Sequence, residues 1–111
     1  MTISANIVWY IGEDVSIPDT IYQADGITPE NITGWSVSFI VHAIGSSTPL
    51  ITKTVGAGIV LTTPLSGLLT VTIAAADSAT LAANQYCFKV VRTDAGADAI
   101  LTTGFLTLLG S

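Results

Sequence analysis

Charged residues are scarce in this chain. Asp, Glu, Lys and Arg make up 10% of its 111 residues, while 50% are hydrophobic; an ordinary soluble domain carries about 25% charged residues. The stretches 31–52 and 54–76 contain no charged side chain at all. Because charged side chains keep a protein surface in water, the deficit indicates either a membrane protein or a surface that other proteins cover.

A long apolar run is also missing, which argues against a membrane. A spanning helix needs about 20 consecutive apolar residues, but glycine, proline, serine and threonine repeatedly interrupt the stretch 54–76. The first residues, 1–6, lack the basic start and the apolar core of a secretory signal. We therefore expect a protein that is made in a cytoplasm, has no membrane partner and is destined for an assembly.

Basic residues and cysteines are few as well. Three Lys and Arg residues stand against eight Asp and Glu residues, so a surface that tracks nucleic-acid phosphates is excluded. The single Cys87 excludes an internal disulfide and a multi-cysteine zinc site. A chain of this length buries enough surface for one two-layer core, and we expect a single domain over residues 1–111.

A repeated strand pattern is what the sequence does contain. Short segments rich in Val, Ile, Thr and aromatic residues alternate with clusters of Gly, Pro, Asp and Asn, which is typical of a sandwich or a barrel. One strand is predicted over 35–43, where four large apolar residues occupy alternate positions: Trp35, Val37, Phe39 and Val41. Alternate side chains of a strand share a face, so these four are predicted to face the core, together with Leu69, Val71 and Tyr86 from later strands.

Turns and edges complete the predicted fold. Pro18 marks the segment 13–23 as an edge strand or a bulge, and a β-hairpin with its tip at 93–98 joins 86–92 to 99–109. A short helical turn is predicted over 77–83, because Asp77 is a good N-cap residue and alanines follow it. About seven antiparallel strands with one short helical turn predict an all-β, immunoglobulin-like β-sandwich, with Tyr86 packed at a corner.

Short motifs along the chain point to a known family. They are Gly12–Ile17, Asp25-Gly26, Ile32–Trp35, Gly58-Ile59, Leu68–Ile73, Asp77–Leu81, Gln85-Tyr86 and Val90–Asp94. Together they resemble the immunoglobulin-like domains of tailed-phage virion proteins, in particular the N-terminal domain of the baseplate upper protein family. The resemblance extends from about residue 12 to residue 109. It implies a structural virion protein of a tailed bacteriophage, either a tail or baseplate component or a capsid decoration, located in the virion after synthesis in the host cytoplasm.

The residues that catalysis would need are isolated. A Ser-His-Asp triad would depend on His42, the only histidine, and a thiolate nucleophile would depend on Cys87, with Lys89 two positions along the same strand face. Ordinary surface or half-buried side chains are the expected state of both. We predict no catalytic residue, no enzyme activity, no cofactor and no small-molecule substrate.

Acidic residues near the start raise the possibility of calcium. Five of them precede the first basic residue: Glu13, Asp14, Asp19, Asp25 and Glu30. Calcium takes about six to eight oxygen ligands from regularly spaced loop positions, and these five do not have that spacing. A solvated acidic edge is the expected alternative, and no metal site is predicted.

Apolar residues on both faces of the two terminal strands are the strongest interaction signal. Only one face of a sandwich strand meets the core, so the second apolar face predicts a contact with another protein. Seven residues are predicted at this interface: Ile3, Ile7, Trp9, Tyr10, Ile100, Leu106 and Leu108. We expect the contact to form a homo-oligomer or to join other virion proteins. The alternative is that the strand ends cover each other or that the register shifts at Gly104.

A different class of function stays open, a glycan- or receptor-binding surface module. Such modules expose aromatic rings beside carboxylates or amides. Trp9 and Tyr10 close to Glu13 and Asp14 form the group in this sequence that fits that description.

Overall fold

Strands make up most of the chain. The structure is a computed structural model that describes residues 3–23, 25–94, 96 and 99–110, with side chains from Ile7 onward. The described residues form eight strands: β1 (Ile3–Tyr10), β2 (Val15–Thr20), β3 (Val37–Ala43), β4 (Pro49–Val55), β5 (Gly58–Thr63), β6 (Leu68–Ile73), β7 (Asn84–Arg92) and β8 (Ala99–Leu109). A 3-10 turn, η1 (Pro64–Ser66), follows β5, and α1 (Ala75–Ser78) follows β6. The all-β prediction is confirmed, with eight strands in place of about seven. No helix among the described residues has the length and apolarity that crossing a membrane requires.

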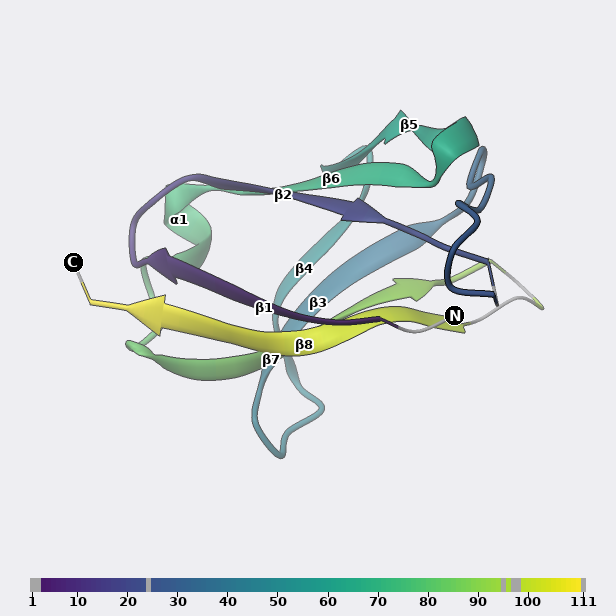
Figure 1. Cartoon of the computed structure of the whole chain (residues 1–111). Helices are drawn as coiled ribbons and strands as arrows, with labels where there is room; N and C mark the ends of the chain where they lie inside the picture. Colours follow the sequence, from purple (N-terminus) through teal and green to yellow (C-terminus); the bar gives the residue numbers. More distant parts are fainter. Residues whose placement is uncertain (1–2, 24, 95, 97–98, 111) are drawn as a thin grey trace.

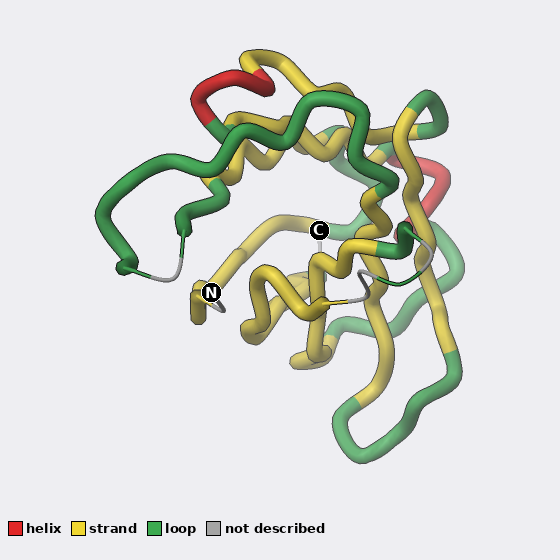
Figure 2. Tube along the Cα trace, turned by 90° about the vertical axis from the view of Figure 1, so that its right-hand side faces the viewer, coloured by secondary structure: helices red, strands yellow, loops and turns green. Residues whose placement is uncertain are grey.

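The strands form one hydrogen-bonded sheet that folds over on itself. Their order is β1-β8-β7-β3-β4-β5-β6-β2. In Figure 1, β2, β5 and β6 form an upper layer, β1, β7 and β8 form a lower layer, and β3 and β4 run obliquely between them. Figure 2 shows the strands curled around a shared interior, with the long β2–β3 loop at the end nearest the viewer. This arrangement agrees with the predicted β-sandwich.

Two of the strand pairings are parallel, which the sequence prediction did not include. β1 pairs in parallel with β8, and β4 and β5 share a short parallel contact. Strands that pair in parallel along their length need a long connection, and β1 and β8 are separated by nearly the whole chain. β4 and β5 are joined by two residues and pair at only two positions. The chain crosses from the lower to the upper layer at residues 11–14 (Figure 1), so β1 and β2, although consecutive, lie at opposite ends of the sheet order.

The core follows the predicted alternation in the central strands. Val37, Phe39 and Val41 of β3 are buried, as are the alternate residues of β6 and β7. The Phe39 and Phe88 rings lie 5.5 Å apart, centroid to centroid. Trp35 is the exception: it precedes β3 and is only partly buried, with the Arg92 guanidinium carbon 3.8 Å from the centroid of its ring. A cation–π contact at the rim of the core therefore replaces the predicted central position.

Three of the predicted interface residues lie in the core. Trp9 is 2% exposed, and Leu106 and Leu108 are buried as completely. For Leu106 and Leu108 the cause is a register shift in the β7–β8 pairing, between Val90 and Val91, since one extra residue moves the following side chains of β8 to the opposite face. Beyond it Leu106 and Leu108 face inward, where Leu108 stands opposite Trp9 of β1. Their side chains are core contacts, and the prediction that they meet a partner is wrong for these three.

The connection between β6 and β7 carries both a correction and a confirmation. The helical turn begins at Ala75, earlier than predicted, because the Asp77 carboxylate lies inside the turn and accepts a hydrogen bond of 2.8 Å from the Ala74 amide. Leu81 packs partly against the core. The Tyr86 hydroxyl donates a 2.7 Å hydrogen bond to the Ala82 carbonyl, which is the tyrosine corner of immunoglobulin-like sandwiches.

Candidate functional site

The outward side chains of β1, β8, β7, β3 and β4 form one surface, which we call the outer face. Its positions alternate with buried residues along each strand. The large apolar members are Val8, Tyr10, Ile40, Leu50, Val91, Ile100, Phe105 and Leu109, and Ser and Thr fill about half of the remaining places. Among the outward side chains that the structure describes on these strands, Lys89 is the one with a charge.

Several large apolar side chains of the outer face are highly exposed to solvent. Val8, Tyr10 and Phe105 are 61%, 49% and 47% exposed. Other exposed large apolar side chains, such as Ile27 and Leu65, stand apart in loops and turns, and single residues of that kind are normal on a protein surface. A sheet face that combines several of them with almost no charge is the structural counterpart of the charge deficit in the sequence.

The predicted interface residues divide among three environments. Tyr10 and Ile100 are exposed on the outer face, so the prediction for them stays a prediction. Ile7 is half-buried and points inward, toward the cavity described below. The side chain of Ile3 lies outside the described residues. Sequence reasoning left out Val8 and Phe105, and Val8 had a signal that was available, since it alternates in step with Tyr10.

Cys87 and His42 occupy directly paired positions on the outer face. Cys87 of β7 lies opposite His42 of β3 on one side and opposite Phe105 of β8 on the other. Paired residues of this kind have Cβ atoms about 4.5–5.5 Å apart. The Nδ1 atom of His42 lies 3.0 Å from the Ala43 carbonyl oxygen, where a catalytic triad places an orienting carboxylate. This geometry indicates that His42, Cys87 and Phe105 pack side by side on the sheet surface, and it does not indicate a catalytic site.

The acidic residues that precede Lys53 in the sequence do not form a cluster in the structure. The Asp14 carboxylate accepts a 2.6 Å hydrogen bond from the Ala75 amide. The Asp25 carboxylate accepts bonds from the Thr28 hydroxyl and from the Ile27 and Thr28 amides, and these hydrogen bonds, the hydroxyl first, lower the pKa of Asp25. Within the described part of the chain, no three His, Cys, Asp or Glu side chains are close enough to hold a metal ion.

Asp19 differs from the other carboxylates because it points inward. A cavity of about 200 Å³ lies beside it, lined among the described residues by Ile7, Ile17, Pro18, Asp19, Phe39, Val71, Phe88, Val90 and Thr102. The Thr102 hydroxyl donates a 2.8 Å hydrogen bond to the Asp19 carboxylate. Burial raises the pKa of Asp19 above its usual value, partly offset by hydrogen bonds from the Thr102 hydroxyl and the Thr20 backbone. Sequence reasoning placed Asp19 in a solvated acidic edge and missed this cavity.

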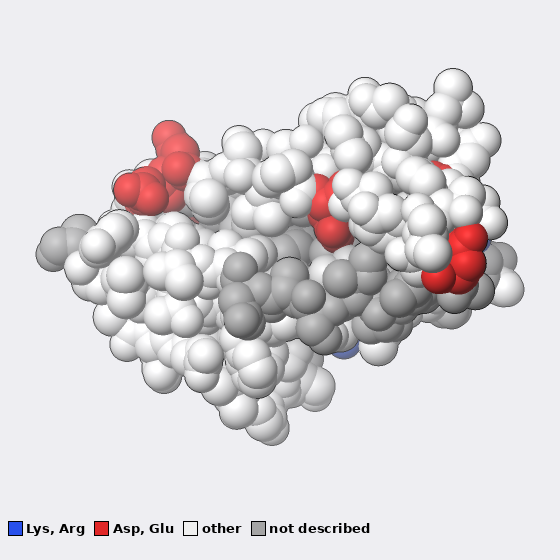
Figure 3. Space-filling model, in the orientation of Figure 1, with Lys and Arg blue, Asp and Glu red and all other residues white. Residues whose placement is uncertain are grey.

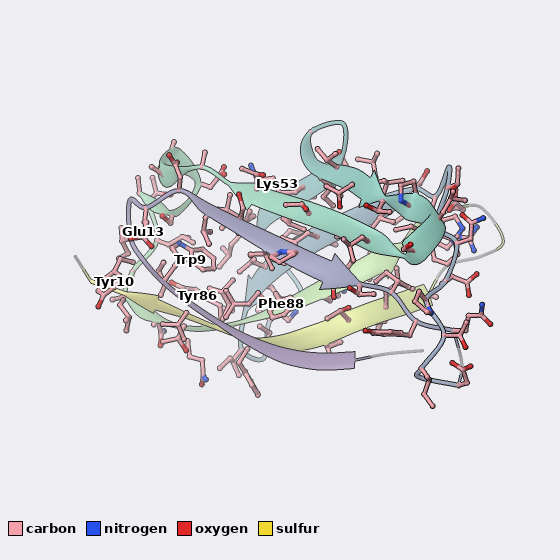
Figure 4. All side chains as sticks on the ribbon, turned by 45° about the horizontal axis from the view of Figure 1, so that its top comes forward. Trp9, Tyr10, Glu13, Lys53, Tyr86 and Phe88 are labelled. Carbon is pink, nitrogen blue, oxygen red and sulfur yellow. The ribbon has the colours of Figure 1, made fainter. Side chains whose placement is uncertain are left out.

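The aromatic group that a glycan-binding module would use is divided by the fold. Figure 4 shows Trp9 in the interior near Tyr86, while Tyr10 and Glu13 lie toward the end of the molecule. Trp9 is 2% exposed, so its ring is not available to stack on a sugar. The visible surface in Figure 3 is nearly free of charge, with acidic side chains in a few separate patches.

Comparisons with known proteins identify the fold. No protein-family model matches this chain, and no curated protein matches it. Among solved structures the chain is similar to the N-terminal domain of phage TP901-1 ORF48, with a TM-score of 0.62 and 15% sequence identity, over 97% of this chain and 94% of that chain. At this identity the likeness shows a shared fold. It confirms, as a likeness of fold, the resemblance to the N-terminal domain of a phage protein.

Proposed function

We propose that this chain is a structural protein of a tailed-phage virion, a tail, baseplate or capsid-decoration component that acts by assembling with other virion proteins. The outer face carries this proposal, because an exposed apolar surface with one charge is suited to a protein contact and unsuited to water. The fold shared with a domain of a phage protein supports the virion setting. The proposed role is non-enzymatic.

The size of the outer face suits an interface. The five strands lie about 4.8 Å apart and average about eight residues in length, at about 3.3 Å per residue, so they span about 20 Å by 26 Å. The sheet area is on the order of 500 Å², before the area added by the side chains is counted. A standard interface takes about 800 Å² from each partner, so a specific contact would occupy the whole face together with its margins.

The upper layer supplies an internal comparison. Its outer face carries Ser16, Pro18, Thr70 and Thr72, with Val60 as an exposed large apolar residue. Val60 is 58% exposed and Val8 is 61% exposed. The two valines are therefore matched in residue type and in exposure, and both point outward from a strand. They differ in the layer that carries them and in strand position, because β1 ends the sheet order and β5 lies within it.

Val8→Asp and Val60→Asp are the matched test of this proposal. A charge buried in an interface without a partner costs several kcal/mol, whereas a charge on a solvated strand face costs little. Each variant is supplied to a phage that lacks the wild-type gene, and its amount in purified particles is measured. We expect incorporation of Val8→Asp to fall at least tenfold and incorporation of Val60→Asp to equal that of wild type.

Circular dichroism controls for folding, and sedimentation velocity measures self-association of the purified chain. We expect both variants to keep the wild-type spectrum. If the outer face joins copies of this chain, the Val8→Asp protein sediments as a smaller species than the Val60→Asp protein. Equal incorporation of the two variants would show that the outer face is not the assembly surface.

A further inference from the structure

One carboxylate, that of Asp19, points into the space between the two layers, and none of the basic side chains that the structure describes lies beside it. Asp19 is on the inward side of β2, in line with Val15 and Ile17, which pack against the core. Of the basic side chains, Lys53 pairs with Asp77 at 2.7 Å and Arg92 pairs with Asp94 at 2.8 Å. Lys89 is on the outer face of β7. The described residues thus leave the negative charge of Asp19 unneutralised.

Protection of the sheet edge explains only part of this arrangement. β2 ends the sheet order, and an inward-pointing charge together with a proline is a known way to keep an edge strand from pairing with other chains. Pro18 and Asp19 fit that role. Edge protection does not require open volume next to the charge, yet a cavity of about 200 Å³ adjoins Asp19. The combination of a cavity, apolar walls and one unneutralised carboxylate is the chemistry of a cation site.

We propose that this cavity receives a lysine side chain from an extended segment of a partner protein. The methylene stem of the lysine lies against Ile17, Phe88 and the other apolar walls, and its ammonium group pairs with the Asp19 carboxylate. This proposal rests on one part of the proposed function, namely that the chain has protein partners. The site itself, between β1 and β2, is separate from the outer face.

The volume of the cavity and its polar groups favour a lysine side chain as the occupant. Sites for drug-sized ligands occupy about 300–1,000 Å³, so a cavity of about 200 Å³ suits a single long side chain. Oδ2 of Asp19 already accepts the Thr102 hydroxyl. A guanidinium group pairs best with both oxygens of a carboxylate at once, while a compact ammonium group needs one. Lysine therefore fits better than arginine.

The position of the cavity favours an extended segment as the carrier of the lysine. The lining residue Ile7 belongs to β1, and Ile17, Pro18 and Asp19 belong to β2. These are the two terminal strands of the sheet, each with one hydrogen-bonded neighbour in the described structure. An extended segment added along such an edge directs alternate side chains toward the two faces of the sheet. One of them would enter the space between the layers.

The test uses n-butylammonium chloride as a probe for the lysine side chain. Amide NMR spectra of the nitrogen-15-labelled chain at pH 7 are recorded during titration. We expect saturable shifts at Asp19, Thr102 and their strand neighbours, weakened at least tenfold in Asp19→Asn. Sodium pentanoate, which has an equally long apolar stem but a negative charge, should produce no saturable shift, and n-propylguanidinium should bind more weakly than n-butylammonium.

Control variants separate the carboxylate from a change in the fold. Asn at position 19 keeps the side-chain size and an acceptor for the Thr102 hydroxyl, Asp19→Ser is the second variant, and Glu13→Gln removes an exposed acid far from the cavity. Binding of n-butylammonium should be weakened at least tenfold in both Asp19 variants and unchanged in Glu13→Gln. Absence of saturable shifts, an equal response to pentanoate, or undiminished binding by the Asp19 variants would overturn the proposal. None of these results bears on the Val8→Asp comparison.

Discussion

β1 and β2, the first and last strands of the sheet order, face each other across the interior. The two ends of the space between them are built in opposite ways. At the closed end, where the chain crosses at residues 11–14, the Gly12 amide donates a 3.0 Å hydrogen bond to the Ser78 hydroxyl of α1, and Trp9 fills the space below. At the open end, the layers leave a cavity beside Asp19 and Thr102. Within a few residues of β1 and β2, the space between the layers thus changes from one filled by side chains to a cavity with apolar walls and one carboxylate. We therefore expect substitutions at the closed end to change stability most, and substitutions at the open end to change the proposed binding of lysine.

The largest effect is expected at the closed end, from Trp9→Ala. Removing a fully buried tryptophan costs about 3–5 kcal/mol, a large part of the 5–15 kcal/mol that stabilises a typical domain. The matched control is Tyr10→Ala, the next residue, which is 49% exposed on the opposite face and should change the free energy of unfolding by no more than about 0.5 kcal/mol. Urea unfolding followed by circular dichroism measures both. Equal midpoints would show that Trp9 is not part of the core.

A smaller effect is expected from the tyrosine corner at the same end. Tyr86→Phe removes the hydroxyl that donates to the Ala82 carbonyl and keeps the ring in place, so the expected loss is about 0.5–1.5 kcal/mol, the net value of one hydrogen bond. Thermal unfolding should show a lower Tm. Tyr10→Phe, a change at an exposed ring, serves as the control and should leave Tm unchanged. The same Tm for both variants would mean that the corner hydrogen bond contributes nothing.

The central strands could be predicted from the sequence because their two faces differ in polarity. Along β3, apolar Val37, Phe39 and Val41 alternate with Ser38 and His42, so the inward face follows from the pattern alone. β1 and the second half of β8 are apolar on both faces. Alternation cannot choose between two such faces, and the choice was made by a register shift next to Val90, which leaves no signature in the local sequence. Trp9, Leu106 and Leu108 were misassigned for this reason.

The candidate sites depended on pairings between distant parts of the chain. Composition showed that charge was missing, but the outer face became visible only once strands far apart in sequence were placed side by side. The hydrogen bond between Asp19 and Thr102 joins residues separated by 83 positions. The sequence prediction placed Asp19 among solvated acids, although Val15 and Ile17 alternate in step with it and indicated its inward direction. The contact with Thr102 depends on the fold and has no signal in the local sequence.

The smallest effect, and the one that best separates the two ends, is expected from Asp19→Asn. Burial raises the pKa of the Asp19 carboxyl, so the folded chain holds this proton more tightly than the unfolded chain does. The favourable contribution of this group is complete below the pKa of the unfolded chain, which lies near 3.8, and is lost as pH rises through the raised pKa of the folded chain. Asparagine carries no charge, so the variant should have a higher Tm than wild type at pH 7. The difference should disappear in acid.

Asp25→Asn is the control, because its carboxylate responds in the opposite direction. Hydrogen bonds from the Thr28 hydroxyl and from backbone amides lower the pKa of Asp25, so its contribution to stability is present at neutral pH and is lost as pH falls through the lowered value. The Asp25 variant should therefore melt below wild type at pH 7 and approach it in acid. If Asp19→Asn also lowered Tm at pH 7, the carboxylate at the open end would be a structural support of the sheet. A rise in Tm would instead show that the chain keeps a charge there at the expense of its own stability, as residues retained for binding do.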